Sequence, residues 1–214
     1  GVAKAKGELL EYLDESSIAL INADDRVVCQ GVQRTKGRLL TFGFQCESKF
    51  RGEGLILDQK GCGHFLLHNF PIDLQIPGKH NAYNALAAAA IGIELGVASS
   101  QIQEALSSFR PPSRRSEVTC KNGVTIINDS YNANPNSMRA ALDMLTAMTG
   151  TGGRKIALLG DMLELGELSP QLHADVGHQA AEVVDILLAI GPHSQHIVEA
   201  AQAAGLTRAY HFAD

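Results

Sequence analysis

The sequence predicts an α/β protein in two successive parts. Between residues 27 and 76, short strand-like runs are separated by glycines, and at Pro77-Gly78 the apolar period becomes helical. Later in the chain, strands alternate with helices, a pattern typical of a parallel, Rossmann-like sheet. The Pro111-Pro112 pair forbids helix between the two patterns. We therefore expect one part over residues 1–109 and a second over residues 110–214.

The composition fits a folded protein that spans no membrane. Of the 214 residues, 45% are hydrophobic and 19% are charged, and no apolar run reaches the length of a membrane span. The net charge of −5 disfavours nucleic acid as the main partner, because a phosphate-binding surface is usually basic. The four cysteines lack C-x-x-C spacing. We expect a cytoplasmic protein with reduced thiols.

The first part begins with a helical pattern and a buried-strand pattern. Leu9, Leu10 and Leu13 form one apolar stripe, which predicts a helix over residues 2–13. The next predicted strand, 18–21, ends in the turn-forming sequence Asn-Ala-Asp-Asp. Further strands are expected at residues 39–44, 55–57, 64–67 and 72–76, in a half-exposed antiparallel segment.

Two helices follow these strands. Apolar residues recur at helical spacing from Ala82 to Glu94, and Gly96 is expected to end that helix. A second helix is predicted from Ser99 or Ser100, either of which is a good N-cap, through Leu106.

The second part opens with a predicted β-hairpin. Its strands are residues 117–120 and 124–127, and Asn122-Gly123 between them is the pair that a type I′ turn favours. Later elements are expected as helices at 136–148, 170–184 and 193–204, and as strands at 155–159, 186–190 and 209–212. No helix follows the last strand in this sequence, so we expect an incomplete sheet.

Eight residues without a large aliphatic side chain, Asn128–Pro135, lie between a predicted strand and a predicted helix. Open α/β sheets gather ligands at such junctions. Asp129 could accept hydrogen bonds from ribose hydroxyls or face a metal, or it could be an ordinary loop residue. Asn134 could instead cap the next helix, with Pro135 in its first turn.

Two carboxamides open the helix after Gly78. Asn81 and Asn84 are three residues apart, so both fall on one helix face. A carboxamide donates and accepts at once, which matches the N6/N7 edge of adenine. The alternative is that Asn81 caps the helix and Asn84 is solvated.

Charged residues supply further candidates. Arg114 and Arg115 lie between the two parts, where a guanidinium suits phosphate, although a solvated surface pair is the alternative. Asp161 follows a predicted strand and would lie in a ligand crevice or in a plain turn. The chain has no G-x-x-x-x-G-K-[ST] sequence, so these residues would supply adenine and ribose contacts without a phosphate cradle.

Five stretches together resemble the Mur ligase family. They are residues 2–8, 20–25, 78–89, 128–137 and 159–166, the last together with His173. The sequences Asp-Ser-Tyr-Asn-Ala-Asn-Pro and Gly-Asp-Met-x-Glu-Leu-Gly are typical of the branch that adds D-Ala-D-Ala. The resemblance covers essentially the whole chain.

The resemblance implies a three-domain fold. This chain would hold the C-terminal part of a P-loop-type central ATPase domain, followed by a partial Rossmann-like domain. In peptidoglycan synthesis, ATP would phosphorylate the terminal carboxylate of UDP-N-acetylmuramoyl-tripeptide, and the amino group of D-Ala-D-Ala would attack the acyl phosphate. Mg²⁺ and positive side chains would offset the charge on the phosphoryl oxygens. The protein would act as a monomer.

The same resemblance implies roles for single residues. Lys6 would be carbamylated and help hold Mg²⁺, and Arg114, or Arg115 if the register shifts by one, would approach the γ-phosphate. The residues expected to bind ATP through its adenine and ribose are His80, Asn81, Asn84 and Asp129. The residues expected near the two substrates are Tyr131, Asn132, Asn134, Asp161 and His173.

The family's UDP-substrate domain, P-loop and last helices have no counterpart in this sequence. We therefore expect these 214 residues to be a piece of a longer protein, inactive alone, with Lys6 unmodified. Two other hypotheses stay open: a related amide ligase of the folylpolyglutamate synthase type, and a nucleotide-binding module without catalysis.

Overall fold

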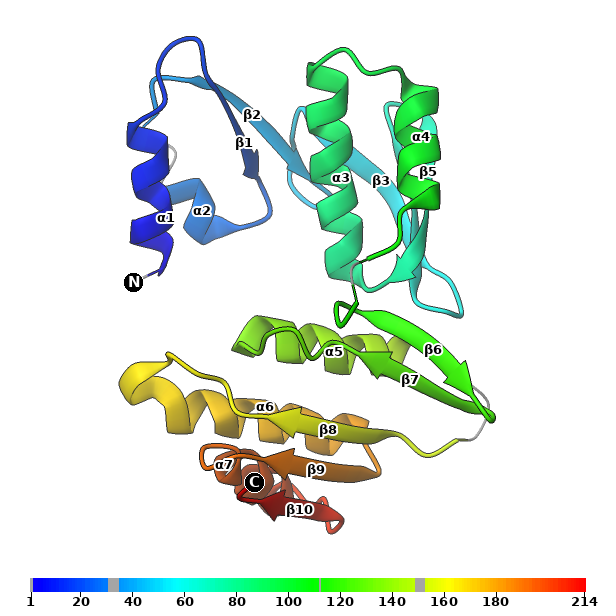
Figure 1. The fold of residues 1–214 in the computed structure, drawn as a ribbon. Coiled ribbons are helices and arrows are strands. Elements are labelled where there is room, and N and C mark those ends of the chain that lie inside the picture. The colour runs from blue at the N-terminus through cyan, green and yellow to red at the C-terminus, as the bar shows by residue number, and fades with distance from the viewer. Residues whose placement is uncertain (1, 31–34, 112, 149–152) are drawn as a thin grey trace. The chain divides into compact units, whose positions relative to one another are not determined.

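The computed structural model describes residues 2–30, 35–111, 113–148 and 153–214. The chain forms two compact units (Figure 1). The N-terminal unit holds residues 1–58, 62–75 and 79–110, and the C-terminal unit holds residues 111–214 with the short segments 59–61 and 76–78. Each unit buries its own set of apolar side chains.

A five-stranded sheet forms the N-terminal unit, in the order β1-β2-β3-β4-β5. The elements of this unit are α1 (Val2–Glu11), β1 (Ile18–Asn22), α2 (Arg26–Gln30), β2 (Arg38–Gly43), β3 (Phe50–Leu57), β4 (Cys62–Leu67), β5 (Phe70–Pro77), α3 (Lys79–Glu94) and α4 (Ser99–Ser108). β1 pairs with β2 in parallel, whereas β3 pairs with β4 in antiparallel fashion. Only two residues, His68 and Asn69, join β4 to β5, and both have positive φ.

Two expectations about the segment from α2 to β3 are wrong. α2 lies where strands were predicted, because Asp25 Oδ1 accepts the N–H groups of Val27 (2.9 Å) and Val28 (3.1 Å) and so starts a helical turn. The strand segment is also not wholly antiparallel, because β2 and β3 pair in parallel. The residues between these two strands form a loop held on Asp24, in place of the tight turn that makes a hairpin.

α3 approaches the sheet through small residues. Its buried positions are Ala82, Ala85, Leu86, Ala89 and Ala90. Gly63 on β4 faces this helix, since a Cβ added there would lie 3.2 Å from the Cβ of Ala82. Small groups on both sides therefore let the helix lie close to the strands.

The predicted end of α3 is confirmed, whereas the predicted start of α4 is wrong. Gly96 ends α3 as predicted, with φ at 79°. The predicted serine cap of α4 is wrong, because Ala98 occupies the cap position. Gln101 reaches back instead, and its Oε1 accepts the N–H of Ala98 at 3.4 Å.

The C-terminal unit contains the predicted hairpin and a parallel sheet. β6 (Glu117–Lys121) and β7 (Val124–Asn128) pair in antiparallel fashion, and Asn122 and Gly123 both have positive φ, as a type I′ turn requires. The later elements are α5 (Pro135–Ala147), β8 (Ile156–Gly160), the 3₁₀ helix η2 (Gly166–Leu168), α6 (Ser169–Val183), β9 (Ile186–Ile190), α7 (Gln195–Ala203) and β10 (Ala209–Phe212). β8, β9 and β10 run parallel in the order β10-β9-β8. The predicted α/β fold class is confirmed.

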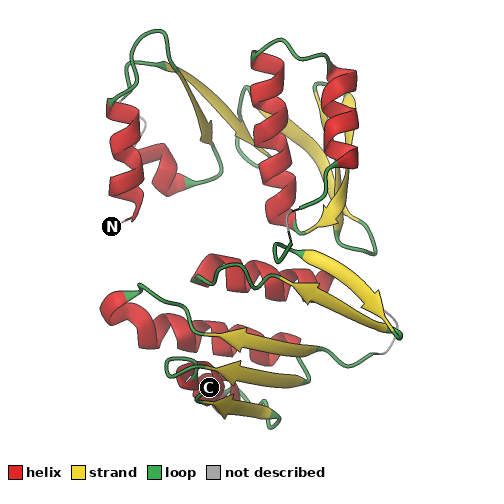
Figure 2. Cartoon of the chain, in the orientation of Figure 1, coloured by secondary structure: helices red, strands yellow, loops and turns green. Residues whose placement is uncertain are grey.

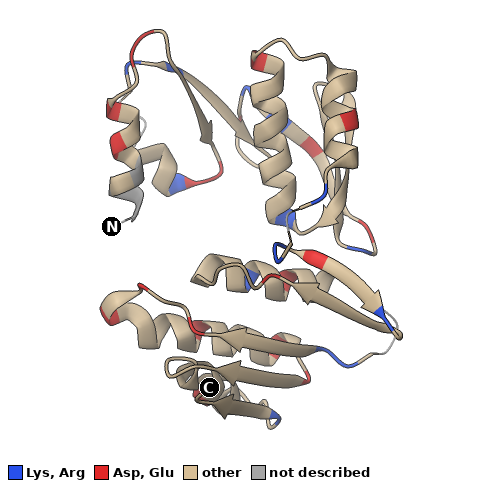
Figure 3. Cartoon of the chain, viewed as in Figure 1, with Lys and Arg blue, Asp and Glu red and all other residues tan. Residues whose placement is uncertain are grey.

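Helices α5, α6 and α7 share one core with this sheet and cover one of its faces (Figure 2). The buried core residues are Met138, Leu142, Ala157, Met162, Val176, Ala180, Val184, Leu187, Ala189, Ile197, Val198, Ala201 and Ala209. Gly177 lets α6 and α7 pack closely, since an added Cβ would lie 2.2 Å from the backbone oxygen of Ile197. The strands themselves carry no charged residue (Figure 3).

Two further observations concern the chain as a whole. No helix in the described part of the chain is both long and apolar enough to cross a bilayer. The four cysteines are not paired with one another in disulfides.

Candidate functional site

The turn after β1 places a carboxylate inside a ring of donors. Asp24 accepts hydrogen bonds from the backbone N–H groups of Phe44 (2.8 Å) and Cys46 (2.7 Å), and from the Tyr83 hydroxyl (2.8 Å). Burial raises the pKa of Asp24, but these donors outweigh burial and lower the pKa to about 2. Burial and the hydrogen bond to Asp24 raise the pKa of Tyr83 to about 12.

Tyr83 belongs to the first turns of α3, where the two predicted carboxamides also lie. Asn84 Nδ2 donates to Asn81 Oδ1 at 3.4 Å, so the two side chains do point together, as their spacing predicts. Asn84 is exposed and Asn81 is half-buried. His80 is half-buried in the same turn. The pair therefore presents amide donors and acceptors from one helix face.

In the C-terminal unit, Asp129 follows β7 and is held by a strained segment. Asp129 Oδ1 accepts the backbone N–H of Ser116 at 2.7 Å. Ser116 is buried and has φ at 48°, and Arg114 has φ at 65°, so two residues adopt the left-handed conformation before β6. This backbone path directs the Ser116 N–H toward the carboxylate.

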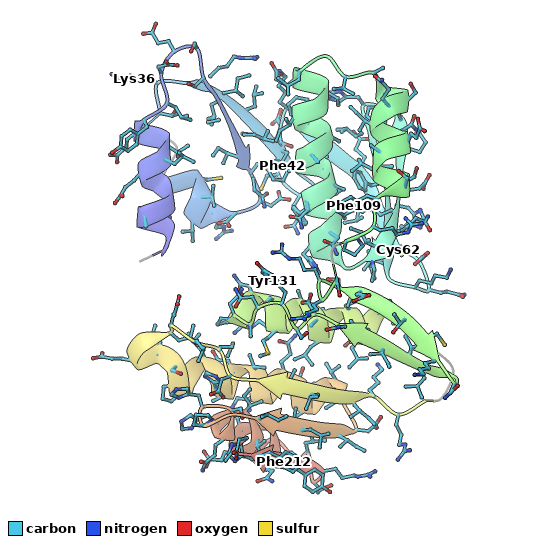
Figure 4. The ribbon with its side chains drawn as sticks, in the orientation of Figure 1. Lys36, Phe42, Cys62, Phe109, Tyr131 and Phe212 are labelled. Atoms are coloured by element: carbon cyan, nitrogen blue, oxygen red, sulfur yellow. The ribbon has the colours of Figure 1, made fainter. Side chains whose placement is uncertain are left out.

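Tyr131, labelled in Figure 4, lies between β7 and α5 and joins the two candidate arginines. Its N–H donates to the backbone oxygen of Arg114 at 3.1 Å. The guanidinium of Arg115 stacks over its ring, with Cζ 4.0 Å from the centroid. Arg114 thus contributes its backbone to this contact, whereas Arg115 contributes its charge. Tyr131 is 64% exposed, so the stacked pair faces solvent.

The two asparagines before α5 make local hydrogen bonds. Asn134 is the N-cap of α5, and its Oδ1 accepts the N–H groups of Asn136 (3.0 Å) and Ser137 (2.9 Å). The capping alternative for Asn134 is therefore confirmed. Asn132 Oδ1 accepts the N–H of Ala133 at 2.8 Å. Substrate binding by either asparagine stays a prediction.

Asp161 ties the end of β8 to the loop after β9. Its Oδ1 accepts the N–H of Ser194 at 2.6 Å, and its Oδ2 accepts the N–H of His193 at 3.2 Å. Gly191 lies against it, since an added Cβ would be 2.6 Å from Oδ1. Asp161 therefore organises the carboxyl edge of the parallel sheet, where α/β proteins bind ligands.

His173 supports the same edge from inside. It is fully buried, and its Nε2 accepts the N–H of Met162 at 3.0 Å. Its Nδ1 lies 2.7 Å from the backbone oxygen of Ser169, so Nδ1 carries the ring proton. In this conformation His173 positions the turn next to Asp161. Its nearness to the incoming dipeptide stays a prediction.

The metal prediction rests on a residue that is only partly described. Lys6 lies in α1, but its side chain is outside the described residues. Among the described residues, no group of three or more His, Cys, Asp or Glu side chains could hold a metal ion.

Sequence reasoning missed three of the residues that organise these sites. The sequence predicts Asp24 only as part of a turn, and it indicates no role for Tyr83 or Ser116. Their partners lie 13 to 59 residues away, as in Asp24–Tyr83 and Ser116–Asp129. Periodicity within one element therefore gave no signal for them.

Comparison with known proteins assigns the family. Residues 1–92 match the description "Mur ligase middle domain", and residues 114–214 match "Mur ligase, glutamate ligase domain". The chain belongs to the Mur ligase family, which confirms the resemblance seen in the sequence.

Individual relatives are similar to this chain over most of its length. UDP-N-acetylmuramoyl-tripeptide–D-alanyl-D-alanine ligase of Escherichia coli (strain K12) is 34% identical over 222 residues, which cover 100% of this chain and 47% of that protein. The protein of the same name in Bacillus subtilis (strain 168) is 34% identical over 180 residues, which cover 83% of this chain and 38% of that protein.

Solved structures show the same fold. A crystal structure of MurF from Acinetobacter baumannii superposes with a TM-score of 0.85 at 29% identity, covering 99% of this chain and 46% of that one. The MurF ligase of Thermotoga maritima has a TM-score of 0.80 at 22% identity, covering 98% of this chain and 47% of that one, and shows the fold alone. The chain spans less than half the length of these relatives.

Proposed function

We propose that this chain supplies the adenosine-binding and acceptor-side residues of an ATP-dependent ligase that joins D-Ala-D-Ala to UDP-N-acetylmuramoyl-tripeptide in peptidoglycan synthesis. Whole-chain identity to ligases with that name supports the substrates. The Asn81–Asn84 pair on α3 is the observation that carries the use of ATP. A cytoplasmic location and a monomeric state are parts of the same proposal.

The residues present fit the nucleoside end of ATP. Two neighbouring carboxamides offer both the donor and the acceptor that the adenine edge needs. Asp129 uses Oδ1 for Ser116, and its second oxygen would accept a ribose hydroxyl. Arg114 and Arg115 would face phosphate oxygens, with Tyr131 holding the guanidinium of Arg115 in place.

The proposed chemistry begins with transfer of a phosphoryl group from ATP to the tripeptide carboxylate. A carboxylate oxygen is a poor leaving group, and the phosphoryl group makes it a good one. The D-Ala-D-Ala amine then attacks the acyl carbon, and phosphate leaves. Positive side chains stabilise the charge that develops on the phosphoryl oxygens. Tyr131, Asn132, Asn134, Asp161 and His173 are the proposed residues of the substrate side.

Among the described residues, no group of three or more His, Cys, Asp or Glu side chains could hold Mg²⁺. Lys6 stays our candidate for the carbamate that would help hold it. The sequence also lacks a phosphate-cradling P-loop, and we therefore propose that the 214 residues do not turn over alone.

Binding of ATP by the chain tests the proposal. Ligand-observed NMR should show saturation transfer to the adenine protons of ATP. Asn81→Ala or Asn84→Ala should weaken binding about tenfold, because a good two-point contact to adenine discriminates by about 1–3 kcal/mol. Gln75→Ala removes an exposed carboxamide from β5 in the same unit and is the matched control. Equal binding by all four proteins, or equal binding of GTP, would contradict the adenine site.

A further inference from the structure

The carboxylate of Asp24 has no part in the functional assignments above, yet it accepts hydrogen bonds from three backbone N–H groups and one hydroxyl. Its Oδ2 accepts the Phe44 N–H and the Tyr83 hydroxyl, and its Oδ1 accepts the Cys46 N–H. The N–H of Gln45 lies 3.2 Å from Oδ1 and 3.1 Å from Oδ2. A carboxylate has about four acceptor positions, so this one is almost fully used by the protein. Such a group orients its neighbours and has little capacity left for a ligand.

Gly43 and Phe44 also lie close to this carboxylate. A Cβ added to Gly43, at the end of β2, would lie 2.9 Å from Oδ1 of Asp24. The next residue, Phe44, packs its ring edge-to-face against Tyr83, with centroids 4.9 Å apart, and against Phe65, with centroids 5.0 Å apart. The loop after β2 and helix α3 are therefore joined by a charge-assisted hydrogen bond and by an aromatic contact at the same point.

Tyr83 transmits this attachment to the candidate adenine site. It lies two residues after Asn81 and one residue before Asn84, on a different face of the same helical turns. Anchoring one face of a helix fixes its rotation about its own axis. With Tyr83 held on Asp24, the carboxamides of Asn81 and Asn84 are left together on a common side.

We propose that Asp24 is a positioning residue, which acts through the Tyr83 hydroxyl to fix the rotation of the first turns of α3 so that Asn81 and Asn84 face an adenine base. This inference rests on the proposed adenine site. It assigns the Asn-Ala-Asp-Asp turn a task in nucleotide recognition beyond chain reversal.

Three variants separate this role from general stability. Tyr83→Phe removes only the hydroxyl and keeps the aromatic contacts. Asp24→Asn removes the charge and places an amide donor opposite backbone donors. Asp25→Asn is the matched control, because it makes the same change in charge one residue away, at a carboxylate that caps α2. A denaturation curve for each protein confirms that it is folded.

Two measurements test the positioning role of Asp24. Amide hydrogen exchange over residues 83–86, without nucleotide, reports the order of the first α3 turns. The affinities for ATP and GTP, measured by NMR titration, report purine recognition. Tyr83→Phe and Asp24→Asn should speed exchange about tenfold and lower the ATP affinity about tenfold, because hydrogen bonds to charged groups are among the stronger ones. Both should also reduce the preference for ATP over GTP, whereas Asp25→Asn should change none of these values.

The outcomes separate the positioning role of Asp24 from the proposed function on which that role rests. If the unmodified chain binds ATP but Tyr83→Phe leaves the exchange or the ATP preference unchanged, the positioning role is overturned and the proposed function stands. If the unmodified chain does not bind ATP, the proposed function fails and the inference fails with it. Faster exchange together with a lost ATP preference in both variants supports the positioning role.

Discussion

At the scale of single residues, the hydrogen bond between Asp24 and Tyr83 contributes to two pKa shifts of opposite direction. Asp24 is more acidic because its neighbours donate to the charged form, and Tyr83 is less acidic because it is buried and donates its proton to a carboxylate. For Asp24 the folded pKa lies below the unfolded one, so its contribution to stability is present above about pH 4. For Tyr83 the folded pKa lies above the unfolded one, so its contribution is lost only as pH rises from about 10 to about 12.

The lowered pKa of Asp24 predicts that acid measurably lowers the stability of the fold. As pH falls from about 4 toward 2, protonation of Asp24 should remove about 1–2 kcal/mol of the free energy of unfolding, after allowance for solvent screening. Asp24→Asn should lower stability at pH 6 and flatten the dependence between pH 5 and pH 2. Urea denaturation at several pH values checks the difference between the two proteins. Parallel stability curves would show that Asp24 does not titrate in this way.

Contacts between residues that are close in the sequence could be predicted more readily than contacts between distant residues. The facing of Asn81 and Asn84 follows from helical spacing alone and is confirmed. The capping alternative for Asn134 follows from its place before a proline and is also confirmed. The contact of Asp24 with Tyr83 depends on how distant elements pack, which no local pattern encodes.

At the scale of elements, agreement depends on length and on what starts each element. The long helices α3, α5 and α6 and the strands β8 to β10 appear where their apolar periods predict them. α2 does not, because it is five residues long and begins through the side chain of Asp25. The parallel pairing of β2 and β3 could not be read either, since strand direction is set by a loop folded around Asp24.

The hydrogen bond from Met162, which follows β8, to His173 on α6 gives a prediction about how these two elements are joined. His173→Phe keeps a large buried ring but leaves the N–H of Met162 without its acceptor. A buried unpaired donor costs about 1–3 kcal/mol, so the free energy of unfolding should fall by that amount. His178→Phe changes an exposed histidine on the same helix and should cost less than about 0.5 kcal/mol. If the two variants lose the same stability, the buried hydrogen bonds of His173 do not hold the turn.

At the scale of the whole molecule, two compact units carry the matches to the Mur ligase middle and glutamate ligase domains. Each unit presents one group of candidate residues, with Asn81 and Asn84 in the first, and Asp129 with Tyr131 in the second. The structure describes each group by itself, so their joint use by one ATP molecule is part of the proposal.

The proposed inactivity of the 214 residues is a prediction about this whole chain. With ATP, Mg²⁺, UDP-N-acetylmuramoyl-tripeptide and D-Ala-D-Ala, a phosphate-release assay should show no turnover above background, since the sequence has no P-loop. The E. coli relative under identical conditions is the positive control. Sustained phosphate release that depends on D-Ala-D-Ala would contradict this prediction.

We propose above all that the first turns of α3 hold the adenine of ATP. Photolabelling with 8-azido-ATP, followed by peptide mapping, tests it most directly because the reactive group lies on the base. We expect the label to fall within residues 79–94, and we expect excess ATP, but not GTP, to prevent it. A label confined to other peptides, or one that ATP does not suppress, would contradict adenine binding by the first turns of α3.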